Sequence, residues 1–210
     1  RGATLKNEGN FNNLIGLPVT LLLLEEKHRF AVLEMGMNHP GEIARLTEIA
    51  DPEIGVITNV ARAHLEGVGG IEGVARAKVE LIERMGSGSV AVLNGDDPVL
   101  MRAASPFKKQ MVTFGKGPKN DVRAENVRAL DRGGISFHIH YETKSFPVKL
   151  NVPGLQNVYN ALAAAAVGLR AGLSFNDVAE GLGAFKGIHG RFTITELPGG
   201  VILVDDTYNS

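Results

Sequence analysis

Three short runs of apolar, mostly β-branched residues limit what this chain of 210 residues can fold into. Each run is followed by polar or glycine-containing residues and then by a stretch with apolar side chains three and four positions apart, which is the spacing of a helix. The runs are continuous instead of alternating with polar residues, as is typical of strands that helices cover on both faces. The chain is therefore predicted to contain a mostly parallel α/β sheet flanked by helices. The predicted strands are FAVLEM (30–35), IGVITNV (54–60) and VAVLN (90–94), and the predicted helices are 41–51, 71–86 and 97–105, with another opening at Pro18.

The pattern changes after about residue 110, where apolar and polar residues alternate between turns that contain Gly, Asp or Lys. This alternation predicts an added small antiparallel sheet with one dry face and one wet face. Its turns are expected at 131–134 and 142–144.

The last part of the chain combines helices with a hairpin. An Ala-rich helix is expected over 157–170, and a second helix is expected to begin at a cap formed by Ser174 or Asn176. Two final strands are expected to meet at 198–200. We expect this hairpin to be the start of a second domain.

Composition excludes several classes of function. The apolar content of 44% and the net charge of −1 are those of an ordinary globular protein. The sequence shows no run of Lys and Arg, so nucleic acid is not expected as a partner. Its longest apolar run, within ALAAAAVGL, is far shorter than the roughly 20 residues that cross a bilayer, so membrane insertion is not expected either. The absence of cysteine excludes disulfides and thiolate metal sites, and it is compatible with the reducing cytoplasm, where we expect the protein to act.

Three side chains come from three successive strand-like or helical segments of the sequence: Glu34, His64 and Lys78. A carboxylate, an imidazole and an amine at the carboxyl edge of one parallel sheet can hold a divalent cation against a nucleotide phosphate. Each also has an ordinary alternative. Glu34 can be a solvated acid at a strand end, His64 a surface loop residue, and Lys78 a surface helix lysine.

Other polar residues gather where ligands commonly bind. The tract 6–18, KNEGNFNNLIGLP, joins amide side chains to flexible glycines, a composition that also suits a simple turn. The string NGDD (94–97) lies where a predicted strand ends and a predicted helix begins. Asn157 and Asn160 lie in the first turn of another predicted helix. Both groups can contact a ligand, and helix capping is their alternative role. Arg191 and the Asp205–Asp206 pair lie at the apparent domain junction.

Several ordered strings of the sequence are distinctive together: NEGNFNNLIGLPVTLL, AVLEMGMNHPGEI with the residues that follow it through ARAKVEL, VLNGDDP, NVYNALAAAAVGL and GRFTITELPGGVILVDDTYNS. Long ordered strings are far more specific than a lone glycine-rich motif. Read together, these strings resemble the Mur ligases. The resemblance covers nearly the whole chain, and within the family it is greatest for the branch that joins D-alanyl-D-alanine to UDP-N-acetylmuramoyl-tripeptide.

The resemblance implies a magnesium- and ATP-dependent enzyme of peptidoglycan synthesis that forms an amide bond through an acyl phosphate. It implies that Glu34 and His64 bind Mg²⁺ and that Lys78 carries a carbamate, an oxygen donor of the kind Mg²⁺ prefers. It also implies a monomer. The residues implied to contact the nucleotide are Asn94, Asn157, Asn160, Arg191, Asp206, Tyr208 and Asn209, and those implied to touch the UDP-muramoyl peptide are Asn10, Asn12 and Asn13.

The sequence also departs from the family. Its members carry a phosphate-binding GxxGKT/S loop shortly before the NFNN tract, and this sequence begins at Arg1 without that loop. We therefore expect residues 1–187 to be the P-loop Mur ligase central, ATP-binding domain without its P-loop. Residues 188–210 are expected to be the first hairpin of a Rossmann-like C-terminal domain, and the isolated chain is expected to be inactive.

Two other classes of function remain open at this point. One is a related amide ligase that adds a single amino acid, extends folate with glutamate or builds cyanophycin, although an NFNN tract is out of place there. The other is a nucleotide-binding module that has lost catalysis.

Overall fold

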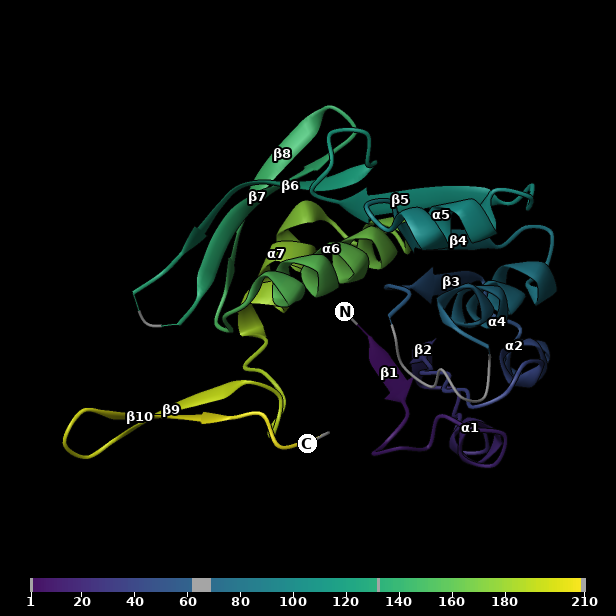
Figure 1. Cartoon of the computed structure of the whole chain (residues 1–210), viewed down its shortest axis with the longest axis horizontal. Helices are drawn as coiled ribbons and strands as arrows, with labels where there is room; N and C mark the ends of the chain where they lie inside the picture. Colours follow the sequence, from purple (N-terminus) through teal and green to yellow (C-terminus); the bar gives the residue numbers. More distant parts are fainter. Residues whose placement is uncertain (1, 62–68, 132, 209–210) are drawn as a thin grey trace. The chain divides into compact units, whose positions relative to one another are not determined.

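The computed structural model describes residues 2–61, 69–131 and 133–208 (Figure 1). The chain divides into two compact units, Arg1–Val112 and Thr113–Ser210. No helix within the described ranges is both long enough and apolar enough to span a bilayer.

The first unit alternates strands and helices along the chain, as the runs of apolar residues predict. Strands β3 and β4 are parallel neighbours, with Ile54 opposite Val90 and Ile57 opposite Leu93. Pro98 at the start of α5 and the Asp97 cap before it fix where that helix begins. The described elements are β1 (Ala3–Lys6), α1 (Gly16–Leu21), β2 (His28–Val32), α2 (Glu42–Ala50), β3 (Ile54–Ile57), α4 (Ile71–Arg84), β4 (Val90–Asn94) and α5 (Pro98–Ala104).

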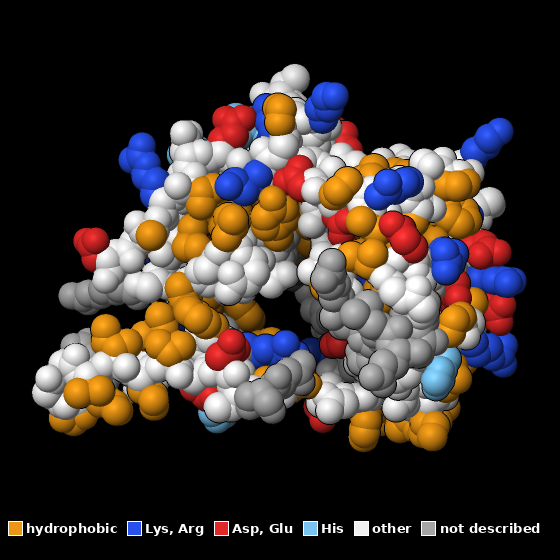
Figure 2. Space-filling model, in the orientation of Figure 1, with side chains coloured by type: hydrophobic (Ala, Val, Ile, Leu, Met, Phe, Trp, Pro, Cys, Tyr) orange, Lys and Arg blue, Asp and Glu red, His pale blue; other side chains and the backbone are white. Residues whose placement is uncertain are grey.

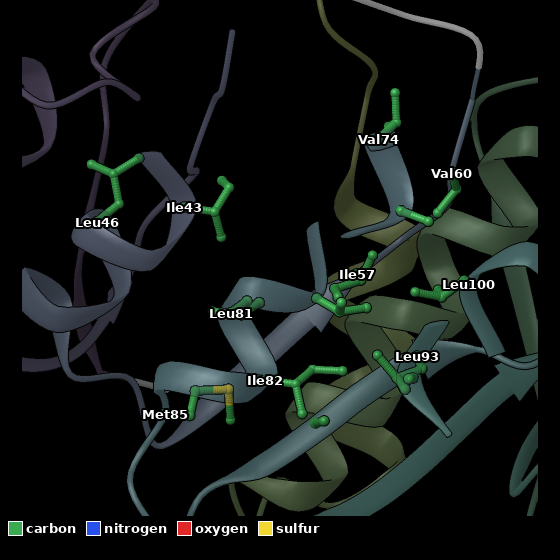
Figure 3. Packing of buried hydrophobic residues seen from close by; sticks show 14 of the residues in the cluster. Ile43, Leu46, Ile57, Val60, Val74, Leu81, Ile82, Met85, Leu93 and Leu100 are labelled. Atoms are coloured by element: carbon green, nitrogen blue, oxygen red, sulfur yellow. The ribbon is translucent and has the colours of Figure 1, made fainter. Parts of the chain in front are cut away.

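The core of the first unit is built from one face of each helix and from both faces of β4. Leu46 of α2, Ile82 of α4, Leu93 of β4 and Leu100 of α5 are fully buried, and Figure 3 shows their side chains among those of the cluster. Every residue of β4 is buried, which explains its unbroken apolar sequence. Burying a side chain of this size stabilises the fold by about 1.5–3 kcal/mol.

The prediction for residues 30–35 is wrong in two respects. The strand is β2, His28–Val32, and it pairs with β1 in a separate two-stranded parallel sheet. It is also mostly exposed, so it is not a strand covered on both faces. An apolar run specifies neither its partner nor its cover, and the polar strand β1 (ATLK) carries no sequence pattern that signals a strand.

The second unit is an antiparallel meander followed by two helices and a hairpin. Strands β6 (Val122–Ala129), β7 (Ile135–Tyr141) and β8 (Lys144–Leu150) pair antiparallel, and the connections fall at the predicted turns. Inward residues such as Phe137 and Val148 are buried and alternate with exposed ones. The prediction of one dry face and one wet face is confirmed.

Two helices cover the dry face of this meander (Figure 1). They are α6 (Leu155–Arg170) and α7 (Phe175–Ala184). Ser174 caps α7 through a capping box with Asp177. Of the two predicted caps, Ser174 and Asn176, it is therefore Ser174 that caps the helix. Small residues of α6 are buried, and the rings of Phe146 and Phe175 lie 5.0 Å apart between β8 and α7.

A separate two-stranded hairpin follows the helices. It consists of β9 (Thr193–Leu197) and β10 (Val201–Asp205), which are antiparallel and joined at the predicted turn. Figure 2 shows hydrophobic side chains along this hairpin at the lower left. Between 39% and 66% of the surface of Ile194, Leu197 and 201–204 is exposed.

The predicted fold class, an α/β protein with a central sheet flanked by helices, is confirmed. The largest sheet has the strand order β3-β4-β5-β6-β7-β8. Strand β5 (Gln110–Gly115) contains the boundary between the two units. Its alternating sequence predicts antiparallel pairing, and this prediction is wrong, because β5 pairs with β6 in parallel, with Phe114 opposite Val122. The antiparallel strands therefore continue the central sheet, and the separate small antiparallel sheet is the β9–β10 hairpin.

Candidate functional site

Glu34 lies just after β2, on the surface, and amide side chains of the N-terminal tract hold it in place. The Nδ2 of Asn12 donates to Oε1 of Glu34 over 3.0 Å. Asn7 forms two hydrogen bonds with the backbone of Glu34. Oδ1 of Asn7 accepts from the Glu34 N–H at 2.7 Å, and Nδ2 of Asn7 donates to the Glu34 carbonyl at 3.4 Å. An exposed carboxylate held in this way can bind a cation.

The same tract shapes the entry to α1. Oδ1 of Asn13 accepts hydrogen bonds from the backbone N–H groups of Ile15 and Gly16, at 3.0 and 2.9 Å. Gly36 N–H donates to the carbonyl of Asn12 at 2.7 Å, so the tract and the segment after β2 are joined through backbone as well as side chains. Asn10 is exposed beside them. Asn12 and Asn13 thus have structural roles in this tract.

Lys78 is a half-buried residue of α4 that donates its Nζ proton to the carbonyl of Asn59 over 2.8 Å. Burial lowers the pKa of Lys78, and the nearby carboxylate of Asp97 offsets part of that effect. Its side chain therefore points toward the segment after β3 instead of into water, as an ordinary surface lysine would. A lowered pKa increases the fraction of neutral amine, which is the nucleophilic form.

Three side chains from three elements hold three consecutive backbone positions after β3, a set of contacts that we call the 58–60 clamp. Asn94, at the end of β4, donates to the carbonyl of Thr58 at 3.0 Å. Lys78 donates to the carbonyl of Asn59, and Oδ2 of Asp97 accepts from the Val60 N–H at 2.7 Å. Oδ1 of Asp97 also accepts from two N–H groups at the start of α5, so one carboxylate joins the loop to the helix. Asn94 is only 8% exposed, so its amide serves this clamp and is turned away from solvent.

In the second unit, Asn157 and Asn160 lie in the first turns of α6, as predicted. The Nδ2 of Asn157 donates to the Pro153 carbonyl at 2.6 Å, and the Nδ2 of Asn160 donates to Oδ1 of Asn157 at 3.4 Å. Asn160 is the exposed member of the pair. An exposed amide at this position can bind a polar ring.

The base of the β9–β10 hairpin carries the remaining candidates. The guanidinium carbon of Arg191 lies 3.9 Å from the centre of the Tyr208 ring, a cation–π contact. Oδ1 of Asp206 accepts from the Phe192 N–H at 3.1 Å, and Asp205 binds His189 at 2.9 Å and Thr207 at 2.7 Å. The side-chain hydrogen bond from Thr207 is the main reason why the pKa of Asp205 is lowered.

Two predicted residues, His64 and Asn209, lie outside the described residues. Glu34 and Lys78 each have their own hydrogen-bond partners, in the N-terminal tract and in the 58–60 clamp respectively. Within the described ranges there is no cluster of three or more His, Cys, Asp or Glu side chains that could hold a metal ion. Sequence reasoning missed Asn7 as a partner of Glu34 and Asp97 as a link between loop and helix. The NGDD string signalled the cap of α5, but nothing in the sequence signals the contact with Val60.

Comparison with known proteins places the chain in a class of ligases. Residues 1–168 match the family described as the Mur ligase middle domain. The chain therefore belongs to the Mur ligase family.

Several relatives are named after one particular reaction. The UDP-N-acetylmuramoyl-tripeptide--D-alanyl-D-alanine ligase of Bacillus subtilis is 37% identical over 207 residues, which cover 98% of this chain and 44% of that protein. MurF from Acinetobacter baumannii superimposes with a TM-score of 0.91 at 35% identity, over 100% of this chain and 46% of that one. MurF ligase from Thermotoga maritima in complex with ADP gives a TM-score of 0.87 at 31% identity, over 100% and 48%. The chain spans less than half the length of these relatives.

Proposed function

We propose that this chain is part of an ATP-dependent ligase that joins the peptide carboxylate of UDP-N-acetylmuramoyl-tripeptide to D-alanyl-D-alanine in peptidoglycan precursor synthesis, in the cytoplasm. The observation that supports this most is the similarity to relatives named for that reaction, which extends in order over 98% of the chain. In this proposal residues 1–187 belong to the central ATP-binding domain and residues 188–210 begin the C-terminal domain.

The proposed chemistry has two steps. A carboxylate oxygen of the tripeptide forms a bond to the γ-phosphorus of ATP while the bond to the bridging oxygen breaks, which leaves ADP and an acyl phosphate. The amine of the dipeptide then forms the C–N bond, releases one proton and displaces phosphate. The first step brings two anions together, so charge neutralisation is its main requirement.

Magnesium bound at the γ-phosphate would supply that neutralisation. We propose Glu34, His64 and a carbamate on Lys78 as the residues that hold it. The exposed Glu34 carboxylate, oriented by Asn12, is the oxygen donor that Mg²⁺ prefers. Lys78 as an ammonium does not fit a cation site, whereas its carbamate does.

The setting of Lys78 supports carbamate formation. The neutral amine adds to CO₂, forming one N–C bond and releasing one proton, and the product carries a negative charge. Burial favours the neutral amine by lowering the pKa of Lys78. The 58–60 clamp shelters this side chain from bulk water on the side of Asn59.

The remaining contacts would be divided between nucleotide and peptide substrate. Asn160, which is hydrogen-bonded to Asn157, would bind the adenine ring. Arg191, which stacks on the ring of Tyr208, would face the phosphates. Asp206 and Asn209 would border the nucleotide at the hairpin base. Asn10 would touch the UDP-muramoyl peptide next to Asn12 and Asn13.

A ligation assay tests this function directly. The longest reading frame that contains the chain is supplied with ATP, Mg²⁺, UDP-N-acetylmuramoyl-tripeptide and D-alanyl-D-alanine, and the amide product and ADP are measured. We expect product formation that needs all components, and none from the 210-residue chain alone. Glu34→Gln should lower the rate by about 100-fold or more, because a charged ligand is replaced by a neutral one.

Glu26→Gln is the matched control, since Glu26 is an exposed acid for which the described residues offer no hydrogen-bond or salt-bridge partner. It should leave the rate unchanged. Efficient turnover with a single amino acid in place of the dipeptide, or equal rates for the two variants, would contradict the proposal.

A further inference from the structure

The wet face of the β6–β8 meander carries a groove at a β-bulge. The register of β6 against β7 shifts between Glu125 and Arg128, and Asn126 there has a left-handed backbone, with φ of 55°. A groove of about 520 Å³ opens beside the bulge, which is the size of a small-molecule site. Its polar lining residues are Asn126, Arg128, Ser136, His138 and Lys149.

Strand register places two cations in one row across this groove. Arg128 on β6 is opposite Ser136 on β7, and Ser136 is opposite Lys149 on β8. Neighbouring strands lie about 4.8 Å apart, so both long side chains can reach a group held above Ser136. In the adjacent row, His138 is opposite Pro147, which adds an apolar wall.

The cations of the groove have no acidic partner among the described residues. Arg128 and Lys149 are exposed, and none of the described side chains forms a hydrogen bond or salt bridge with them. The nearest carboxylate in the register, Glu125, is already bound by Arg123 at 3.1 Å and by His140 at 2.9 Å. Arg128 and Lys149 flank Ser136 from the two neighbouring strands, so an anion above Ser136 lies within reach of both positive charges.

We propose that this groove binds a phosphate monoester of small-molecule size. A guanidinium and an ammonium together match the geometry and charge of a phosphate, and the Ser136 hydroxyl and the Asn126 amide can donate to its remaining oxygens. The wall formed by Pro147 suits an apolar group attached to the phosphate. Helices α6 and α7 lie on the other face of the meander (Figure 1), where the alternate residues are buried, so the groove is separate from the nucleotide contacts proposed on α6.

Cations on an exposed face also have a simpler role. Strand β8 is at the end of the strand order, and lysines on such edges discourage pairing with other chains. That role requires no bound ligand. Binding measurements therefore separate the two explanations.

The test uses the 210-residue chain labelled with ¹⁵N and titrated with phenyl phosphate at constant ionic strength. We expect saturable amide shifts centred on Asn126, Arg128, Ser136 and His138, and weaker binding of inorganic phosphate at the same residues. The double variant Arg128→Gln and Lys149→Gln should weaken binding by at least about tenfold, because each charge-assisted hydrogen bond contributes that much or more.

A second double variant, Lys108→Gln and Lys119→Gln, removes the same charge from exposed lysines elsewhere and should bind as the unaltered chain does. Thermal unfolding of both variants checks that the fold is kept. The proposal is overturned if the shifts grow linearly without saturation, if they centre outside the groove, or if the two double variants bind alike.

Discussion

Asp97 gives the sharpest test of how the first unit holds the loop after β3. One of its carboxylate oxygens caps α5 by accepting from Val99 and Leu100, and the other accepts from Val60. Loss of a helix cap costs about 0.5–2 kcal/mol. Val60 is 8% exposed, so leaving its N–H unpaired costs about 1–3 kcal/mol more. Asp97→Ala should therefore lower the free energy of unfolding by about 1.5–5 kcal/mol.

Asp97→Ser separates the two contributions. Serine is a good helix cap, but its single short oxygen cannot also reach the Val60 N–H. This variant should lose only the stabilisation from the hydrogen bond of the Val60 N–H, which lowers the free energy of unfolding by about 1–3 kcal/mol. Urea unfolding followed by circular dichroism measures both losses, and amide hydrogen exchange at Val60 should accelerate in both variants. If Asp97→Ser is as stable as the unaltered chain and Val60 exchanges no faster, the loop does not depend on this carboxylate.

Two further substitutions test backbone packing and burial. A Cβ on Gly16 would overlap the backbone of Phe11, so Gly16→Ala should destabilise the fold by about 1–3 kcal/mol. A Cβ on Gly181 in α7 would meet nothing within 4 Å, so Gly181→Ala should stabilise the fold by about 0.5–1 kcal/mol. Equal midpoints of urea unfolding for the two variants would contradict this. Burial lowers the pKa of Lys78 in the folded chain below the ordinary lysine value of about 10.4. At alkaline pH below that value the unfolded chain therefore binds more protons than the folded chain, so the free energy of unfolding should rise with pH. Lys78→Met should lack this rise in thermal midpoint between about pH 8 and 10, and parallel curves for the two proteins would show that Lys78 is not desolvated.

The parts of the fold that sequence alone predicted are those with a local physical cause. The unbroken run at 90–94 is buried because β4 is covered on both faces, and Ser174 caps α7 because its hydroxyl reaches the N–H of Asp177. Strand partners have no such local cause. The sequence predicted neither the pairing of β2 with β1 nor the parallel pairing of β5 with β6, because both depend on segments distant in the chain.

The candidate site shows the same division. The amide tract was identified from composition, and the structure brings Asn12 to Glu34, 22 residues apart. Lys78 is half-buried and so is not the surface helix lysine of the alternative interpretation, because α4 packs into the core of the first unit. Its contact with Asn59, and the joint hold of Asn94 and Asp97 on the same loop, depend on how three elements meet, which spacing along the chain does not specify.

The β9–β10 hairpin has a practical consequence for work with this chain in solution. Its apolar side chains face outward, and neither of its strands has a further described strand at its outer edge. Open strand edges with apolar side chains recruit copies of themselves, and that reaction accelerates with protein concentration. The concentration at which the chain is stored, more than the temperature, should then set how long a sample remains monodisperse.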